Sequence, residues 1–143
     1  MASKTPDEST PGTARNPRLI TPAMLRAWPL PDPVGSKYSR GQVLVVGGAR
    51  GTPGAVALSG LAALRMGAGR LTLAVAESAS MSLAVSIPES GVVGLPESST
   101  GSVTGEDVER LLGRDLERSD AVLIGPGLDD PEGTARILEE LVP

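Results

Sequence analysis

The sequence predicts an α/β fold, a parallel doubly wound sheet with helices on both faces. Short continuous apolar runs alternate with longer segments of helical composition, which is the pattern of strands joined by helical crossovers. Of the 143 residues, 40% are hydrophobic and 21% are charged, so a chain of single-domain length has enough apolar surface to bury a core. Only Trp28 and Tyr38 are aromatic, so we expect a core of aliphatic side chains with helices packed closely on the sheet.

The N-terminal part, residues 1–34, is predicted to be separate from the domain formed by residues 35–143. It is polar and without periodicity, and seven of the 13 prolines precede residue 34. We expect a disordered or loosely ordered tail. Within it, Thr21 and Pro22 are typical of an N-cap and a first helical position, so they predict one short helix.

The domain is predicted to open with two strands, each followed by a helix. The run QVLVVG is apolar throughout, which is typical of a strand buried on both faces. Pro53 is tolerated in a first helical turn, and Gly67 and Gly69 end the helix that it begins. We expect strands over 42–47 and 70–76, with helices over 53–66 and 77–85.

The second half of the domain is predicted to continue the alternation. Thr104 and Asp107 form a variant of the capping box ahead of a charged amphipathic segment, and the run DAVLIG predicts another strand buried on both faces. We expect strands over 92–95 and 120–125, with helices over 104–118 and 131–141. Doubly wound sheets usually have five or more strands, so we expect the sequence to be part of a longer domain.

Two glycine-rich loops follow predicted strands, at residues 47–54 (GGARGTPG) and 125–130 (GPGLDD). The carboxyl ends of parallel strands share one edge of a sheet, and ligands of such folds bind there. Glycines allow close approach of a ligand, and the start of the helix behind each loop offers free N–H groups to an anion. The two loops are therefore predicted to meet on one ligand.

Several alternatives for these loops stay open. A Rossmann dinucleotide site needs glycine where Ala49 stands, although Glu77 lies where a ribose-binding acid would be. A Walker A loop is excluded because no Gly-Lys-Ser/Thr sequence enters the helix. The glycines could simply form tight turns. Arg50 could meet a phosphate or be solvated, and Lys37, taken alone, reads as a solvated surface residue.

Composition excludes several classes of function. With no Cys or His, thiol catalysis, disulfides and Ser-His triads are excluded, and no metal site is predicted. Asp129 and Asp130 are expected to be turn or helix-start residues. A net charge of −4 argues against nucleic-acid binding, and no apolar run reaches the roughly 18 residues of a membrane span. The start has no apolar core of a signal peptide, which predicts a cytoplasmic protein.

The sequence resembles the ADP/ATP-dependent NAD(P)H-hydrate dehydratases, metabolite-repair enzymes with a ribokinase-like fold. Segments that carry the resemblance are Lys37, Gly41–Ala55 (GQVLVVGGARGTPGA), residues 62–75 (AALRMGAGRLTLAV), Pro88-Glu89 and Asp120–Leu128 (DAVLIGPGL). The resemblance implies that Ala55 and Gly127 contact the hydrated dinucleotide. It also implies that Lys37 and the backbone of residues 48–54, with Gly48, Gly51 and Gly54, lie near its phosphates, and that Gly125 belongs to the substrate site. Thr52 stands where the family commonly has an aromatic residue.

In such enzymes ADP or ATP, with Mg²⁺, drives the dehydration of hydrated NAD(P)H back to NAD(P)H. The family's histidine segment and its Gly-Thr-Gly-Asp-like loop, which carries the catalytic aspartate, have no counterpart here. We therefore identify no catalytic residue and expect the chain to be inactive alone. Two other functions stay open, a ribokinase-like small-molecule kinase and a non-catalytic nucleotide-binding half-domain. The expected partners are small-molecule nucleotides, and a homo-oligomer is left open.

Overall fold

The computed structural model describes residues 19–28 and 35–142, which belong to two separate compact units, 1–32 and 33–143. In the first unit the predicted short helix is confirmed as α1 (Pro22–Ala27), with Pro22 at its start. The hydroxyl of Thr21 accepts a hydrogen bond from the Met24 amide at 3.2 Å, as expected of an N-cap. The rest of the predicted tail lies outside the described residues.

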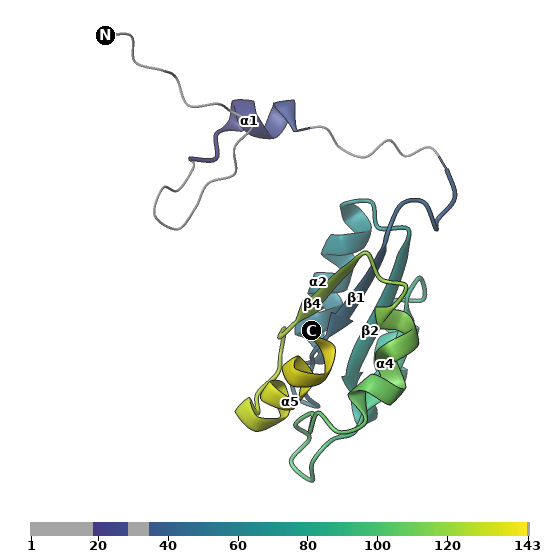
Figure 1. Ribbon diagram of the computed structural model, residues 1–143, viewed down its shortest axis with the longest axis vertical. Coiled ribbons are helices and arrows are strands. Elements are labelled where there is room, and N and C mark those ends of the chain that lie inside the picture. Colours follow the sequence, from purple (N-terminus) through teal and green to yellow (C-terminus); the bar gives the residue numbers. More distant parts are fainter. Residues whose placement is uncertain (1–18, 29–34, 143) are drawn as a thin grey trace. The chain divides into compact units, whose positions relative to one another are not determined.

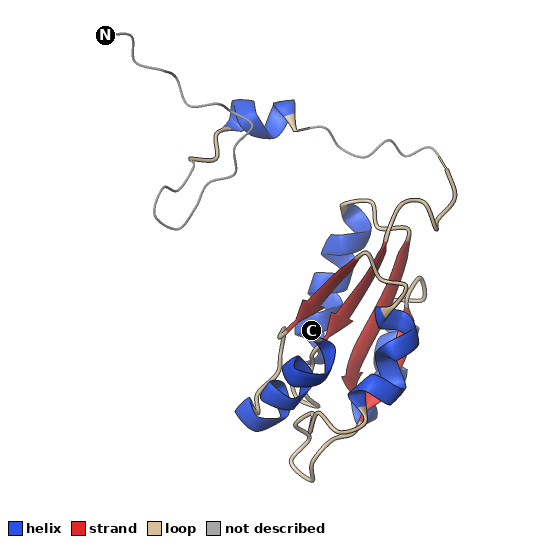
Figure 2. Cartoon of the chain, in the orientation of Figure 1, coloured by secondary structure: helices blue, strands red, loops and turns tan. Residues whose placement is uncertain are grey.

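The second unit contains a sheet of four strands in the order β3-β2-β1-β4, and every neighbouring pair is parallel (Figures 1 and 2). This confirms the predicted fold class. The strands are β1 (Gln42–Val46), β2 (Arg70–Ala76), β3 (Gly91–Leu95) and β4 (Ala121–Ile124). Val45 of the central strand pairs with Leu73 on one side and Leu123 on the other.

Helices cover both faces of the sheet, two on each. Helices α2 (Pro53–Arg65) and α3 (Glu77–Ser86) pack on the face to which Val45 points, whereas α4 (Val108–Leu116) and α5 (Pro131–Leu141) pack on the opposite face. Neighbouring side chains of a strand point to opposite faces, so Leu44 and Val46 point to the face that α4 and α5 cover. In Figure 1, α4 and α5 lie in front of the strands and α2 lies behind them.

The core of this unit is aliphatic, as the composition predicts. Its largest fully buried side chains are leucine, isoleucine and valine, and among residues 35–142 no buried residue is polar or charged. Gly60 allows α2 to lie close to β2, since a Cβ there would come within 2.9 Å of both Leu71 and Leu73. Ala57 and Ala63 also pack against this side of the core, whereas Ala62 is exposed.

Two details of the prediction are wrong. The helix expected from residue 104 begins at Val108, because Asp107 has a left-handed backbone with φ of 58° and its side chain makes no cap hydrogen bond. The Thr104 amide instead bonds the Pro96 carbonyl at 3.0 Å, so the predicted capping box does not form.

The strand expected over 120–125 was predicted to be buried on both faces, and this too is wrong. Val122 is 39% exposed and Leu123 is 44% exposed, because β4 is an outer strand of the described sheet. A continuous apolar sequence is typical of a central strand, but whether the strand is buried depends on the strands beside it. The sequence of the strand alone does not show which strands those are.

Candidate functional site

The two glycine loops meet at the carboxyl edge of the sheet, as predicted. The chain runs outward from β1 to β3 and then crosses back to β4 on the other side of β1. The crevice between β1 and β4 is therefore the topological switch point, where ligands of open α/β sheets bind. The first glycine loop (residues 47–54) follows β1, and the second glycine loop (residues 125–130) follows β4.

Direct hydrogen bonds join the two loops. The Gly48 amide donates to the Pro126 carbonyl at 2.8 Å, and the Ala49 amide donates to the Gly127 carbonyl at 2.9 Å. The Thr52 hydroxyl donates to the same Gly127 carbonyl at 2.7 Å. The loops therefore form one continuous backbone surface.

Some of the glycines are required by the backbone conformation of the loops and by their close neighbours. Gly127 has a φ of +75°, and a Cβ there would lie 2.6 Å from the Thr52 carbonyl oxygen and 3.1 Å from the Cβ of Ala55. Gly48 has a φ of +63°, and a Cβ there would lie 3.0 Å from Val75. At these positions the backbone conformation of the loops is enough to explain why the residue is glycine. The same geometry places Gly127 against Ala55, the two residues that the resemblance assigns to the dinucleotide.

Gly51 and Gly54 have no such requirement. A Cβ at either position would meet nothing within 4 Å, and neither residue has a positive φ. Both are exposed, and within the described parts of the chain neither amide donates to a backbone or side-chain acceptor. Gly54 lies in the first turn of α2, whose N-cap, Thr52, makes no side-chain cap bond. Pro53 has no N–H, and the Ala55 amide donates to the Thr52 carbonyl at 3.2 Å. The start of α2 thus presents the open amide of Gly54 and the positive end of the helix dipole.

Gly125 has a φ of +126° and is exposed, with open space where a Cβ would lie. Its backbone conformation is one that side-chain-bearing residues rarely adopt. Of the predicted site residues, Gly48, Gly51, Gly54, Ala55, Gly125 and Gly127 are thus brought to one edge of the sheet.

The Arg50 side chain is bound by other residues of the protein. The sequence interpretations were a phosphate contact or a solvated side chain, and neither anticipates this. Its guanidinium forms an ion pair with Glu97, and donates to the Ser78 hydroxyl at 3.2 Å and to the Ser99 carbonyl at 3.3 Å. Its amide also donates to the Gly101 carbonyl at 2.9 Å. Arg50 therefore ties the first glycine loop to the segment that follows β3.

The Glu97 carboxylate is the other half of this contact. Hydrogen bonds from Arg50 and Ser78 lower the pKa of Glu97 from its ordinary value, chiefly because they stabilise the charged form. Glu97 is 47 residues from Arg50 in sequence, and no local motif indicates the pairing. Sequence reasoning therefore had no signal for it.

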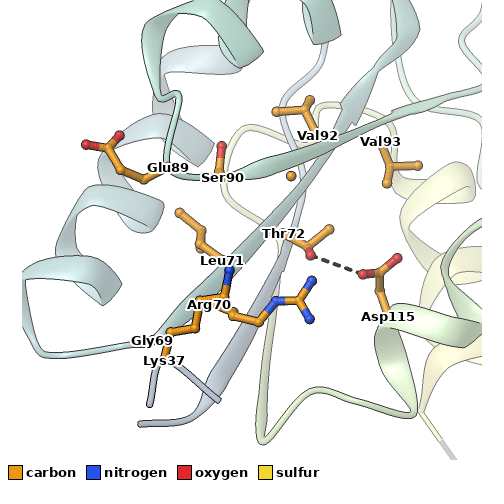
Figure 3. A pocket seen from close by; sticks show the side chains of 11 residues that line it. Lys37, Gly69, Arg70, Leu71, Thr72, Glu89, Ser90, Val92, Val93 and Asp115 are labelled. Atoms are coloured by element: carbon orange, nitrogen blue, oxygen red, sulfur yellow. Dashed lines mark hydrogen bonds between the residues drawn. The ribbon is translucent and has the colours of Figure 1, made fainter. Parts of the chain in front are cut away.

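The structure does not bring Lys37 together with the glycine loops. Lys37 precedes β1 and lies beside Gly69 and Arg70, at the amino ends of the strands. There it lines a cavity of about 360 Å³ with polar and charged residues that include Thr72 and Asp115 (Figure 3). The Thr72 hydroxyl bonds the Asp115 carboxylate at 3.1 Å. This cavity and the joined loops lie at opposite ends of the strands.

Asp130, at the end of the second glycine loop, acts as the sequence predicts. Asp130 is the N-cap of α5, and its carboxylate accepts a hydrogen bond from the Gly133 amide at 2.7 Å. Over residues 19–28 and 35–142 no group of three or more acidic, His or Cys side chains could hold a metal ion. Separately, none of the helices in the described parts has the length and apolar character needed to cross a membrane.

Comparison with known proteins bears on this geometry. Residues 43–142 match the family model of the NAD(P)H-hydrate dehydratases. The chain is 43% identical to an ADP-dependent (S)-NAD(P)H-hydrate dehydratase of Xanthomonas campestris, over 87% of this chain and 43% of that protein. It is 35% identical to a bifunctional NAD(P)H-hydrate repair enzyme of Salinibacter ruber, over 87% of this chain and 23% of that protein.

Solved structures give the same fold. A ribokinase-like superfamily protein of Enterococcus faecalis V583 is 30% identical with a TM-score of 0.62, over 76% of this chain and 34% of that one. A Bacillus subtilis ADP/ATP-dependent NAD(P)H-hydrate dehydratase, co-crystallised with ATP and Mg²⁺, is 23% identical with a TM-score of 0.62, over 85% of this chain and 41% of that one.

The match of the family model covers the strands, both glycine loops and α5. The chain spans less than half the length of the curated relatives it matches. Its four-stranded parallel sheet is ribokinase-like, and the chain belongs to the NAD(P)H-hydrate dehydratase family.

Proposed function

We propose that the joined glycine loops form the dinucleotide-binding surface of a nucleotide-dependent NAD(P)H-hydrate dehydratase. The observation that carries this proposal is the contrast between the glycines. Gly127 and Gly47 are needed to bring the loops together, because a Cβ at either would meet a carbonyl oxygen of the other loop, whereas Gly51 and Gly54 leave open space that the protein itself does not fill. Open glycines next to a helix start are what a phosphate-bearing ligand needs for close approach to the backbone.

In this proposal the diphosphate of hydrated NAD(P)H lies against the amides of Gly51 and Gly54, at the start of α2. Ala55 and Gly127 contact the rest of the dinucleotide, and Gly125 shapes the turn beside them. Small side chains at these positions leave the backbone surface accessible. Lys37 is left out of the proposed site because it lies at the amino ends of the strands.

The proposal covers binding of the hydrated dinucleotide. ADP or ATP supplies the driving force for the dehydration in the proposed reaction, which is a lyase reaction. The described residues contain no carboxylate cluster suited to Mg²⁺, so these side chains do not fit a resident metal and no step is derived through one. No catalytic residue is assigned.

A glycine-filling variant tests the proposal. Gly51→Leu should fold as the parent does, since its Cβ enters open space, but its side chain should occupy the ligand's place. We expect calorimetric titration with hydrated NADPH to show at least a tenfold weaker affinity, about 1.4 kcal/mol. The matched control is Gly113→Leu in α4, where a Cβ also meets nothing within 4 Å. Equal affinities of both variants and the parent would contradict the proposed site.

A further inference from the structure

The polar cavity at the amino ends of the strands, the amino-end cavity, is walled by segments that the protein holds in place. The Gly69 amide donates to the Gly41 carbonyl at 2.9 Å, which fixes the turn before β1 against the start of β2. A Cβ at Gly69 would collide with the Lys37 carbonyl oxygen, so this close approach requires glycine. Helix α4 forms another wall, where the Asp115 carboxylate accepts the hydrogen bond from the Thr72 hydroxyl at 3.1 Å. The lining residues are therefore positioned by the fold itself.

Two cations line this cavity beside one aromatic ring. The Nζ of Lys37 and the Cζ of Arg70 each lie 5.4 Å from the centre of the Tyr38 ring, so one ring attracts both positive groups. Within residues 19–28 and 35–142, neither cation takes part in an ion pair. Like charges in one cavity repel each other, and an anionic group bound between them relieves that repulsion. The pair is therefore suited to an anionic group of a ligand, such as a carboxylate.

A carboxylate of the protein lies across the cavity from Arg70. Arg70 and Thr72 are alternate residues of β2, so their side chains share the sheet face that α4 covers, where Asp115 lies. In Figure 3 the Arg70 guanidinium extends toward Asp115, yet no ion pair joins the two in the part of the chain that the structure describes. One Asp115 oxygen accepts the bond from Thr72, and the second accepts none from the described residues, so it is available to a cationic group. Glu89, the other acid of the lining, points away from the cavity in Figure 3.

Apolar side chains complete the lining and limit the size of a ligand. Val92 and Val93 of β3 are half-buried and border the cavity, whose volume of about 360 Å³ is at the low end of ligand sites. We propose that the amino-end cavity binds a small zwitterion, a free aliphatic α-amino acid, with its carboxylate between Lys37 and Arg70 and its ammonium at Asp115. The valines contact its side chain. This proposal goes beyond the proposed function and does not depend on it, since the cavity and the glycine loops lie at opposite ends of the strands.

A titration of the full 143-residue chain with L-leucine, followed by backbone amide chemical shifts, tests the proposal. We expect saturable shifts at residues 69–72, 91–93 and 115, and none at the glycine loops. Two analogues separate the charges of the ligand, since 4-methylpentanoate lacks the ammonium and 3-methylbutylamine lacks the carboxylate. Each should bind about tenfold more weakly than L-leucine or worse, because each leaves one charged side of the cavity without its partner.

Two variants assign the binding to these side chains. Asp115→Asn keeps an oxygen that can accept the Thr72 bond but removes the charge, and Arg70→Gln removes the guanidinium; each should weaken L-leucine binding about tenfold. The controls are Arg114→Gln and Glu117→Gln, at exposed residues at the end of α4 outside the lining, and both should bind L-leucine as the parent does. Hydrated NADPH is titrated separately into both cavity variants, so failure of this site is distinguishable from failure of the proposed function. The proposal is overturned if L-leucine gives no saturable shifts, if 4-methylpentanoate binds as tightly, or if both cavity variants keep the parent's affinity.

Discussion

At the scale of single residues, the glycines of the two loops differ in what they do. Gly127 and Gly48 have positive φ values and nearby atoms where a Cβ would stand, whereas Gly51 has neither. The sequence alone shows glycine at all three positions and cannot separate them, because the difference lies in neighbours that are distant in sequence, Val75 for Gly48 and Thr52 for Gly127. The same sequence does predict that the loops meet, since both follow parallel strands.

A pair of alanine substitutions measures this difference. Gly127→Ala should lower the free energy of unfolding by about 1–3 kcal/mol, because the residue must keep a left-handed backbone against the Thr52 carbonyl. Gly51→Ala should change it by no more than about 0.5 kcal/mol. Urea unfolding of both variants gives the comparison. Equal losses would mean that the loops are not joined as the hydrogen bonds indicate.

The contact between Arg50 and Glu97 predicts a pH dependence. The pKa of Glu97 is lower in the folded state than its ordinary value of 4.5, so its stabilising effect is complete above that value. The effect is lost as the pH falls through the lowered pKa of the folded state. When the pH is lowered from about 6 to about 3, the melting temperature of Glu97→Gln should therefore fall by less than that of the parent.

The control for this comparison is Glu106→Gln, at an exposed carboxylate outside the contact. Its melting temperature should follow that of the parent across the same pH range. Identical curves for Glu97→Gln and the parent would show that the ion pair adds nothing to stability.

At the scale of elements, local signals in the sequence predict most boundaries. Pro53 and Pro131 mark the starts of α2 and α5 as expected, since a first helical turn tolerates proline. The predicted start of α4 is wrong because the Thr104 amide bonds the Pro96 carbonyl, and a helical pattern in the sequence does not reveal that partner. The predicted burial of β4 is wrong for a similar reason, because the burial of a strand depends on the strands beside it.

Two helical glycines predict opposite effects on stability. Gly113 in α4 has open space at its Cβ position, so Gly113→Ala should raise the free energy of unfolding by about 0.5–1 kcal/mol through helix propensity. Gly60 in α2 lies against Leu71 and Leu73, so Gly60→Leu should lower it by about 1–3 kcal/mol through overpacking. Chemical denaturation of both variants tests the account, which fails if Gly60→Leu is as stable as the parent.

At the scale of the whole sheet-bearing unit, the strand order separates two polar regions. The joined glycine loops lie at the carboxyl ends of the strands, and the cavity with Lys37 and Arg70 lies at the amino ends. The parallel order could be predicted from the alternation of strands and helices. Lys37 lies at the amino ends of the strands because it precedes β1, and the parallel order predicts this position. Only the family resemblance assigns Lys37 to the phosphates, at the opposite end.

The measurement that tests the central claim most directly is a map of backbone amide chemical shifts of the 143-residue chain during titration with hydrated NADPH. The account predicts shifts in residues 47–55 and 125–128, where the two loops join, with little change at residues 69–72 and 89–93 around the amino-end cavity. Shifts confined to that cavity, or none at the loops at saturating ligand, would contradict it.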